Sequence, residues 1–508
     1  MLMPRRDLFA NLARTAALAT VAGDGMSRLA AADRVTRSDI VRFEPEMEPL
    51  VRLVEDTPRQ QCVEAIARKL RSGLSYRQLL AAVFLAGIRN INPQPPGFKL
   101  HCVFVLHSAH QLSLDASHTE RLLPLLWALD YFKRSQAEDV AEGDFRLLEV
   151  QGALPSASKA WQEYHAAMES WDVERADRAI AVLARSQGAH ELMEGLWRHG
   201  ARDYRNIGHK AIFVANTWRT LQTIGWQYAE PALRSLTLGL LDFGPDLRMN
   251  GYRFEDQSHA SNSAVARATL ATLPDDWVST ASPDPSATTD ILAAIREFRP
   301  IPVGNAVAGM LAKGSARASD IWTAVHLAAG ELMMRLPGIL GVHCLTSANA
   351  LHYAFRMAGD PETRLYLALQ AAGWMSQFGH FMSGQDGFRA FRIDRLESAE
   401  VSDDPQGSSG EILKLLTEDA DLAARKAHGH AVAHPGDPSF ARAARTLLFN
   451  KVRDSHHFKY AAAAFEDLSL VDPAWQPHML ATSTYYLRGS EHPDSQVVQR
   501  ARAALHRS

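Results

Sequence analysis

The stretch LGVHCLTSANALHYAF, residues 340–355, decides the interpretation of this chain. Its apolar residues recur at intervals of three and four, which is typical of a helix packed in a core. A similar stretch, KLHCVFVLHSAHQLSL, covers residues 99–114 and has the same His-Cys pair near its start and a second histidine nine residues later. Two such similar helices in distant parts of one chain indicate an internal repeat.

The same pattern occurs at four places. LHCVFVLHSAH, GHKAIFVANTW, VHCLTSANALH and HHFKYAAAAF each put a histidine at or near the start of an apolar helix, and the aligned residues are His101, His209, His343 and His457. A further predicted helix follows each of them, with Glu120, Glu230, Glu362 or Gln476 in its first turn. We therefore predict four pseudo-repeats of about 110 residues and about four helices each, over residues 42–140, 155–245, 288–385 and 411–490.

Helical periodicity continues through almost the whole chain after residue 40. Segments such as residues 63–87 and 360–378 are rich in Ala and Leu, and no segment alternates as a half-buried strand does. The sequence therefore predicts an all-α fold with a single helical-repeat domain over residues 42–508. Because one repeat alone would expose an apolar face, neighbouring repeats must stack. They form either an open helical array or a closed α/α ring, and the sequence leaves both arrangements open.

Composition excludes several classes of protein. With 508 residues and 46% hydrophobic side chains, the chain can bury large cores. Its 54 basic and 57 acidic residues give a formal charge of −3, which does not favour nucleic acid or an anionic membrane as a partner. No apolar run after the N-terminal segment is long enough to span a bilayer. The three cysteines are too few for a disulfide scaffold and have the wrong spacing for a zinc knuckle.

The N-terminal segment resembles a twin-arginine export signal. MPRRDLFANLARTAALATVAG places Arg5 and Arg6 before a weakly hydrophobic stretch, and the small residues of LAAAD follow as a cleavage region. The order Leu8-Phe9 departs from the usual Phe-Leu, and Arg14 interrupts the apolar stretch. We expect residues 1–32 to be a signal that directs the protein to the periplasm or otherwise out of the cytoplasm. An amphipathic N-terminal helix is the alternative.

The repeated histidines have a structural and a chemical explanation. A neutral imidazole can accept a hydrogen bond from a free N–H of a helix first turn, but it is a poorer cap than Ser, Asp or Asn. If the repeats surround one axis, His101, His209, His343 and His457 face a common space and can bind a transition metal, with iron as the first candidate, or a haem. His190 and Glu194 share one helix face and are predicted to be further metal ligands or ligand-orienting residues.

Standard catalytic motifs do not add a competing site. The chain has no H-E-x-x-H motif, no CxxCH haem-attachment motif, no phosphate-binding loop and no G-x-S-x-G elbow. Cys102 and Cys344 each follow an aligned histidine, but buried cysteines on apolar helices are more often packing residues than ligands.

Two of the histidine-bearing stretches, GHKAIFVANTWRTLQTIGW and GVHCLTSANALHYAF, resemble helices of the questin oxidase-like family. They also resemble helical regions that follow Rieske domains in uncharacterised bacterial proteins. This chain lacks the pair of C-x-H motifs of a Rieske domain, so the resemblance implies no iron–sulfur cluster here. It implies an oxidoreductase that acts on an organic substrate, and it assigns a catalytic role to His209 and His343.

Three functions remain open on the sequence. The first is an exported oxidoreductase with a histidine-lined metal or haem site, a small organic substrate and a redox partner protein. The second is a non-catalytic helical-repeat scaffold that binds a protein or peptide on a concave face. The third is a metal-free lyase or hydrolase that uses His/Glu acid–base pairs.

Overall fold

The computed structural model describes residues 39–242, 253–279 and 284–506. These residues form α-helices joined by loops and short 3-10 turns, and within these ranges there is no β-strand, only an isolated bridge between Ile40 and Leu148. The predicted all-α fold is confirmed. The predicted export signal, residues 1–32, lies outside the described residues.

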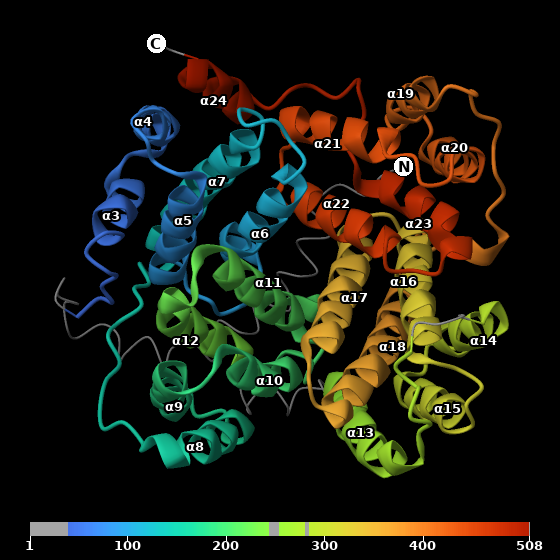
Figure 1. Cartoon of the computed structure of the whole chain (residues 1–508), viewed down its shortest axis with the longest axis horizontal. Helices are drawn as coiled ribbons and strands as arrows, with labels where there is room; N and C mark the ends of the chain where they lie inside the picture. Colours follow the sequence, from blue (N-terminus) through green and yellow to red (C-terminus); the bar gives the residue numbers. More distant parts are fainter. Residues whose placement is uncertain (1–38, 243–252, 280–283, 507–508) are drawn as a thin grey trace.

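Helices of the first half of the chain occupy the left and lower left of Figure 1. They are α3 (Glu48–Asp56), α4 (Arg59–Arg71), α5 (Tyr76–Asn90), α6 (His101–Ser113), α7 (Leu122–Glu142), α8 (Ala157–Ser170), α9 (Val173–Ser186), α10 (Ala189–Gly200), α11 (His209–Ile224) and α12 (Ala229–Leu240).

Helices of the second half continue through the lower right to the top of the same view. They are α13 (Arg253–Thr269), α14 (Pro285–Arg296), α15 (Pro300–Ala312), α16 (Ala318–Arg335), α17 (Ile339–Met357), α18 (Pro361–Ser383), α19 (Pro405–Leu415), α20 (Ala420–Ala433), α21 (Ser439–Lys451), α22 (Ser455–Leu468), α23 (Gln476–Ser483) and α24 (Gln496–His506).

Four helices form the centre of the molecule, with the others around them (Figure 1). Helix α6 contacts α11, α11 contacts α17, α17 contacts α22, and α22 contacts α6. At the C-terminus α24 returns to pack on α4 and α7, where Arg500 forms an ion pair with Glu64 at 2.9 Å. The chain therefore closes on itself instead of ending as an open array, whereas the correspondence of the four pseudo-repeats stays a prediction.

Most residues of the four central helices are buried, and apolar side chains occur on several of their sides. They nevertheless carry polar residues into the interior. Arg219 of α11 is 7% exposed and binds Glu466 of α22 at 2.8 Å and Asn349 of α17 at 3.0 Å. Because a buried polar group is costly without a partner, such contacts fix how the helices sit against one another. Polar side chains thus lie between the four central helices, and buried apolar side chains surround them.

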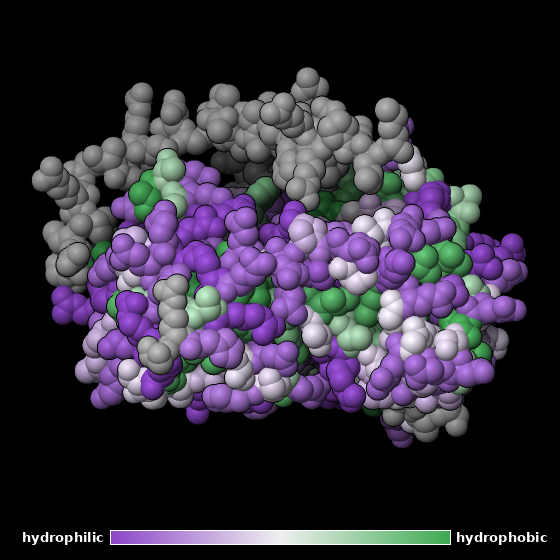
Figure 2. Space-filling model, turned by 90° about the horizontal axis from the view of Figure 1, so that it is seen from above, coloured by the Kyte–Doolittle hydropathy of each residue, from purple (hydrophilic) through white to green (hydrophobic). Residues whose placement is uncertain are grey.

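The outer surface shows mostly polar side chains on the face seen in Figure 2, with small, separate hydrophobic patches. Large hydrophobic residues that are exposed come from widely separated elements, for example Leu114, Phe381 and Val432. None of the described helices is both long and apolar enough to cross a membrane.

Candidate metal centre

The N-terminal ends of the four central helices converge on a cluster of four histidines. His101 and His209 are the first residues of α6 and α11, His343 lies in the first turns of α17, and His456 is the second residue of α22. Nε2 of His209 is 3.0 Å from Nε2 of His101 and 2.9 Å from Nε2 of His343. The structure thus brings together three histidines that the sequence pattern aligned.

His456 completes the cluster. Its ring centroid lies 4.5 Å from that of His101 and 5.2 Å from that of His343. One nitrogen from each of these three residues lies within 4.8 Å of the others, a spacing that could hold a metal ion. Nε2 of His456 is buried and has no hydrogen-bond partner among the described residues. Four imidazoles from four different helices therefore lie together. His101, His343 and His456 form one group of possible ligands, and His209 contacts His101 and His343.

Each imidazole is oriented by a hydrogen bond to its other nitrogen. The acceptors of the four Nδ1–H groups are, in chain order, the carbonyl oxygens of Phe98, Asn206 and Ile339 and a carboxylate oxygen of Asp454, at 2.8, 2.5, 2.7 and 2.6 Å. A carbonyl oxygen only accepts, so each Nδ1 carries the proton and each Nε2 presents its lone pair to the centre. This is how metal-binding histidines are usually held.

Nε2 of His209 lies within hydrogen-bond distance of Nε2 of both His101 and His343. Lone pairs of neutral imidazoles that face one another repel. A proton shared between two of the rings, or a metal ion among them, offsets this repulsion. Nitrogen ligands bound at about 2.0–2.1 Å to one metal ion are about 2.8–3.4 Å apart, in agreement with these separations.

Electrostatics keep the histidines neutral. Burial, together with the nearby ammonium of Lys459, holds the pKa values of His101, His209 and His343 well below the usual range. Burial also lowers the pKa of His456, although its hydrogen bond to Asp454 opposes the shift. Burial likewise lowers the pKa of Lys459 to about 7. Neutral imidazoles are the form that binds a metal ion.

The turns before two of the helices, α6 and α11, have strained backbone. Gly97 and Phe98 precede His101 with φ angles of 121° and 44°, and Asn206 and Ile207 precede His209 with φ angles of 55° and 50°. A positive φ is rare for a residue with a Cβ, and for β-branched Ile207 it is an outlier. Two of these residues, Phe98 and Asn206, supply the carbonyl oxygens that orient the histidines. The strain is therefore found where the site is built.

His457 lies outside the cluster, contrary to the sequence alignment. It is the third residue of α22, and its Nδ1 faces the backbone N–H of Asp454 at 3.3 Å while its ring packs 5.4 Å from Tyr486. Successive helical residues point about 100° apart, so only one of the two adjacent histidines can face the centre. The dipeptide HH left either choice open, and the alignment selected the residue that caps the helix.

His190 and Glu194 also lie away from the cluster. His190 is exposed and its ring packs 5.1 Å from Trp218. Glu194 accepts a hydrogen bond from the backbone N–H of Gly359 at 2.7 Å. The four-residue spacing did place both on one helix. However, His190 packs on an aromatic ring, and Glu194 binds the backbone just before another helix.

The sequence analysis missed two residues at the centre. Asp454 holds His456, and Lys459 lines a narrow cleft between the four central helices. No motif marks these residues, because a single polar residue on an apolar helix resembles ordinary core packing. The helix period was an available signal for Lys459, since it lies one turn after His456 on the same face.

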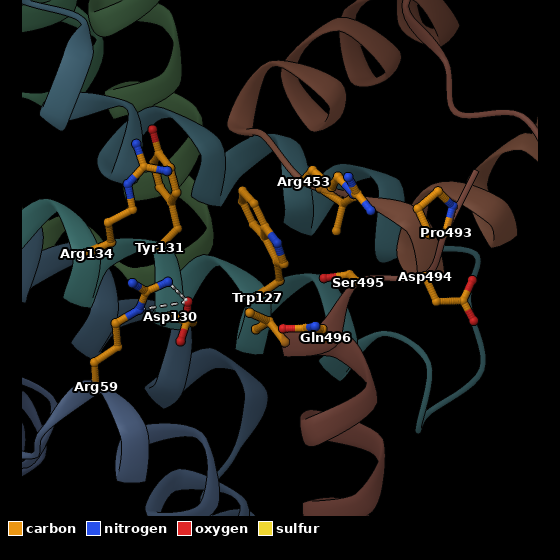
Figure 3. A pocket seen from close by; sticks show the side chains of 12 residues that line it. Arg59, Trp127, Asp130, Tyr131, Arg134, Arg453, Pro493, Asp494, Ser495 and Gln496 are labelled. Atoms are coloured by element: carbon orange, nitrogen blue, oxygen red, sulfur yellow. Dashed lines mark hydrogen bonds and ion pairs between the residues drawn. The ribbon is translucent and has the colours of Figure 1, made fainter. Parts of the chain in front are cut away.

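A surface pocket of about 470 Å³ lies outside this centre, between α7, the start of α24 and the loop before α22 (Figure 3). None of the four histidines lines it. Its Val452 and Arg453 directly precede Asp454, but its charges are largely paired, as Arg59 with Asp130 at 2.6 Å. The histidine cluster is therefore the better candidate for chemistry.

Comparisons with models of protein families, with curated proteins and with solved structures give no match for this chain. The resemblance to the questin oxidase-like family accordingly stays a prediction.

Proposed function

We propose that this protein is a metal-dependent oxidoreductase that binds one transition-metal ion between His101, His209, His343 and His456. The observation that carries the proposal is the orientation of the imidazoles. Nε2 of His209 lies 3.0 Å from that of His101 and 2.9 Å from that of His343, and each of the three rings is fixed by an Nδ1–H hydrogen bond to a carbonyl oxygen. A scaffold explains why the histidines are buried, but not why rings from separate helices meet at their Nε2 atoms. In a metal-free acid–base enzyme two of these rings would share a proton, and metal analysis distinguishes that case from a bound ion.

The ligand set limits the metal and its chemistry. Imidazole nitrogens suit iron, copper, nickel and zinc and do not favour calcium or magnesium. The Nε2 separations of 2.9 and 3.0 Å correspond to neighbouring positions about 90° apart around an ion, which leaves further positions for a substrate. We propose a redox-active ion, with iron as the first candidate. It would supply electron transfer, or polarise a bound oxygen atom, at these positions.

A single ion fits this space better than a haem does. Two imidazoles that bind a haem on opposite sides have the macrocycle between them. Here Nε2 of His209 lies 3.0 Å from that of His101 and 2.9 Å from that of His343, so a macrocycle between those two rings would occupy the place of His209. In this proposal His209 and His343 act as ligands. Export by the twin-arginine signal and a redox partner protein belong to the same proposal.

Metal analysis of paired variants tests the proposal. The protein is purified without a histidine tag or chelator, loaded with iron(II), copper(II) or zinc(II), and freed of excess ion before elemental analysis. We expect about one ion per chain in the wild type and in His457→Ala, and a large loss of bound metal in His456→Ala. His190→Ala is a further control and is expected to keep the metal.

Two results would contradict the proposal. One is a folded wild-type protein that takes up none of these ions. The other is a loss of metal in His457→Ala with full occupancy in His456→Ala. A visible or paramagnetic signature of the loaded protein then distinguishes redox-active iron or copper from zinc.

A further inference from the structure

The pocket of Figure 3 is large enough for a small molecule. Its volume of about 470 Å³ lies in the range of about 300–1,000 Å³ that is usual for ligand sites. Trp127 of α7, Val452 of the loop before α22, and Pro493 just before α24 give it apolar surface. None of the four histidines of the cluster lines it, so the proposed metal site leaves this space unused.

Two buried side chains of the pocket have polar groups without a partner. Trp127 is 5% exposed and Ser495 is 6% exposed. Neither the indole N–H of Trp127 nor the hydroxyl of Ser495 has a hydrogen-bond partner among the described residues. In Figure 3 the indole nitrogen lies on the side of Trp127 that faces Ser495, and the hydroxyl points toward Trp127. Because a buried indole N–H usually has an acceptor, the space between these two groups suits a ligand with acceptor atoms.

One cation of the pocket has no counter-ion. The guanidinium of Arg453 is exposed and forms no ion pair within the part of the chain that the structure describes. The two carboxylates that line the pocket have other partners, because Asp130 binds Arg59 at 2.6 Å and Asp494 binds Lys451 at 2.9 Å. The pocket therefore has one positive charge that neither of its own carboxylates matches.

The other charged groups near Arg453 are already bound. Arg134 binds Glu138 at 2.9 Å. Asp454 follows Arg453 in the chain, but its carboxylate accepts from Nδ1 of His456 at 2.6 Å. One unmatched cation favours a ligand with a single negative charge over a dianion such as phosphate.

The start of α24 adds further donors to the pocket. Ser495, Gln496 and Val497 line it, and Gln496 is the first residue of this 11-residue helix. The first N–H groups of a helix have no acceptor within the helix, and its N-terminus carries a partial positive charge. The backbone and the side chains of the pocket therefore favour the same kind of ligand, an anion.

We infer that this pocket binds a small organic monocarboxylate. The carboxylate accepts from the guanidinium of Arg453, the hydroxyl of Ser495 and the first N–H groups of α24, and the hydrocarbon part lies against Trp127 and Val452. A guanidinium can donate two parallel hydrogen bonds to a carboxylate, which makes Arg453 a suitable anchor. The inference does not depend on a metal ion. It adds a second binding site to the molecule and a class of ligand for it.

Ligand-observed NMR on the full chain tests this inference, since it detects weak binding. The probes are benzoate and hexanoate, with benzamide as a neutral analogue and inorganic phosphate as a dianion. A chelator is present throughout, so that no metal ion binds the probes. The variants are Arg453→Gln, which removes the charge, and Ser495→Ala, which removes the hydroxyl. Arg395→Gln is the matched control, because Arg395 is also exposed but does not line the pocket.

We expect benzoate or hexanoate to bind the wild type more tightly than benzamide or phosphate does. An exposed charge pair and a neutral hydrogen bond have similar strengths, so Arg453→Gln and Ser495→Ala should each weaken this binding about fivefold. Arg395→Gln should bind like the wild type. Circular dichroism establishes which variants fold. Because Arg453 is exposed, Arg453→Gln is expected to fold even if Ser495→Ala does not.

Three results overturn the inference: neither carboxylate binds the wild type, phosphate binds more tightly than both carboxylates, or Arg453→Gln binds them as well as the wild type does. An equal loss of binding in Arg395→Gln and Arg453→Gln also contradicts it, because the net charge of the protein and not this pocket would then determine binding. The proposed metal site fails or stands separately, since these titrations are made with metal removed.

Discussion

At the scale of single residues, the decisive feature is which nitrogen of each imidazole carries a proton and donates a hydrogen bond. A histidine at a helix start is ambiguous, because it can cap the helix, pack in the core or bind a metal. In His101, His209 and His343 a backbone carbonyl oxygen takes the Nδ1 proton, which leaves Nε2 for the centre. In His456 a carboxylate has this role. A substitution can remove the carboxylate of Asp454, but no side-chain substitution removes the three backbone carbonyl oxygens.

Asp454→Asn should weaken metal binding. Burial opposes ionisation of Asp454, yet its hydrogen bond to His456 holds the pKa of the carboxyl well below the usual range, so it is charged at neutral pH. An amide oxygen can still accept from Nδ1 but lacks the charge, and loss of such an orienting group costs about 10–100-fold in metal affinity. Competition with a chelator measures the change.

The matched control for this prediction is Asp419→Asn. Asp419 also caps a helix, where it accepts from the backbone N–H of Leu422, but it lies at the start of α20. This variant should lose a little stability and no metal affinity. Equal chelator competition by Asp454→Asn and wild type would show that the carboxylate does not orient a ligand.

At the scale of elements, the turns before α6 and α11 hold the site in place. Gly97 has a φ of 121°, and a Cβ built on it would lie 3.1–3.3 Å from three atoms of the His209 ring. We expect Gly97→Ala to cost about 1–3 kcal/mol of stability from backbone strain, and also to displace His209 and lower metal affinity. Denaturant unfolding and chelator competition measure the two effects separately.

Gly73→Ala separates the strain from the displacement. Gly73 has a φ of 100°, but a Cβ there would meet no atom within 4 Å. It should therefore lose comparable stability while its metal affinity stays at the wild-type value. If both variants kept that affinity, the contact between Gly97 and His209 would not matter for the site.

The elements also show what the sequence could predict. Period and composition were enough for the all-α fold, and the repeated helix starts were enough to bring His101, His209 and His343 into one group. Choosing between His456 and His457 needed the rotation of α22, which two adjacent identical residues do not reveal. The carbonyl anchors depend on the φ angles of the preceding turns, and no residue type specifies a carbonyl oxygen. The helix period could have placed Lys459 on the same face as His456, but only packing shows that it lacks a hydrogen-bond acceptor among the described residues.

At the scale of the whole molecule, the four central helices enclose a polar interior, and burial lowers the pKa values of the histidines of the cluster. Besides the cluster, His352 of α17 and His199 of the neighbouring helix α10 are buried and His107 of α6 is half-buried, and loss of solvation holds their pKa values well below the usual value of 6.5. The ring of His352 stacks on Trp322 with centroids 4.3 Å apart, and its Nδ1 lies 2.8 Å from Nε2 of His326. In the folded protein these buried imidazoles therefore stay neutral at pH values at which the same residues of the unfolded chain bind protons.

This difference predicts that the protein is less stable in acid. Below a pH of about 6.5 the unfolded chain binds protons at these histidines while the folded chain does not, so the free energy of unfolding falls as pH falls. The stability is complete above about 6.5, and each such histidine contributes a slope of up to about 1.4 kcal/mol per pH unit below it. Denaturant unfolding between pH 8 and pH 5, with a chelator to remove the metal contribution, measures the slope.

His352→Phe tests the origin of that slope. The phenyl ring can still stack on Trp322 but cannot bind a proton, so the slope between pH 7 and pH 5 should become shallower, whatever the change in absolute stability. His118 is exposed, and His118→Phe should leave the slope unchanged. A wild-type stability that does not depend on pH between 8 and 5 would show that the histidines of the interior are protonated without unfolding. Water and protons would then reach the centre of the four helices, and the imidazoles there would not be held in the neutral form that binds a metal ion.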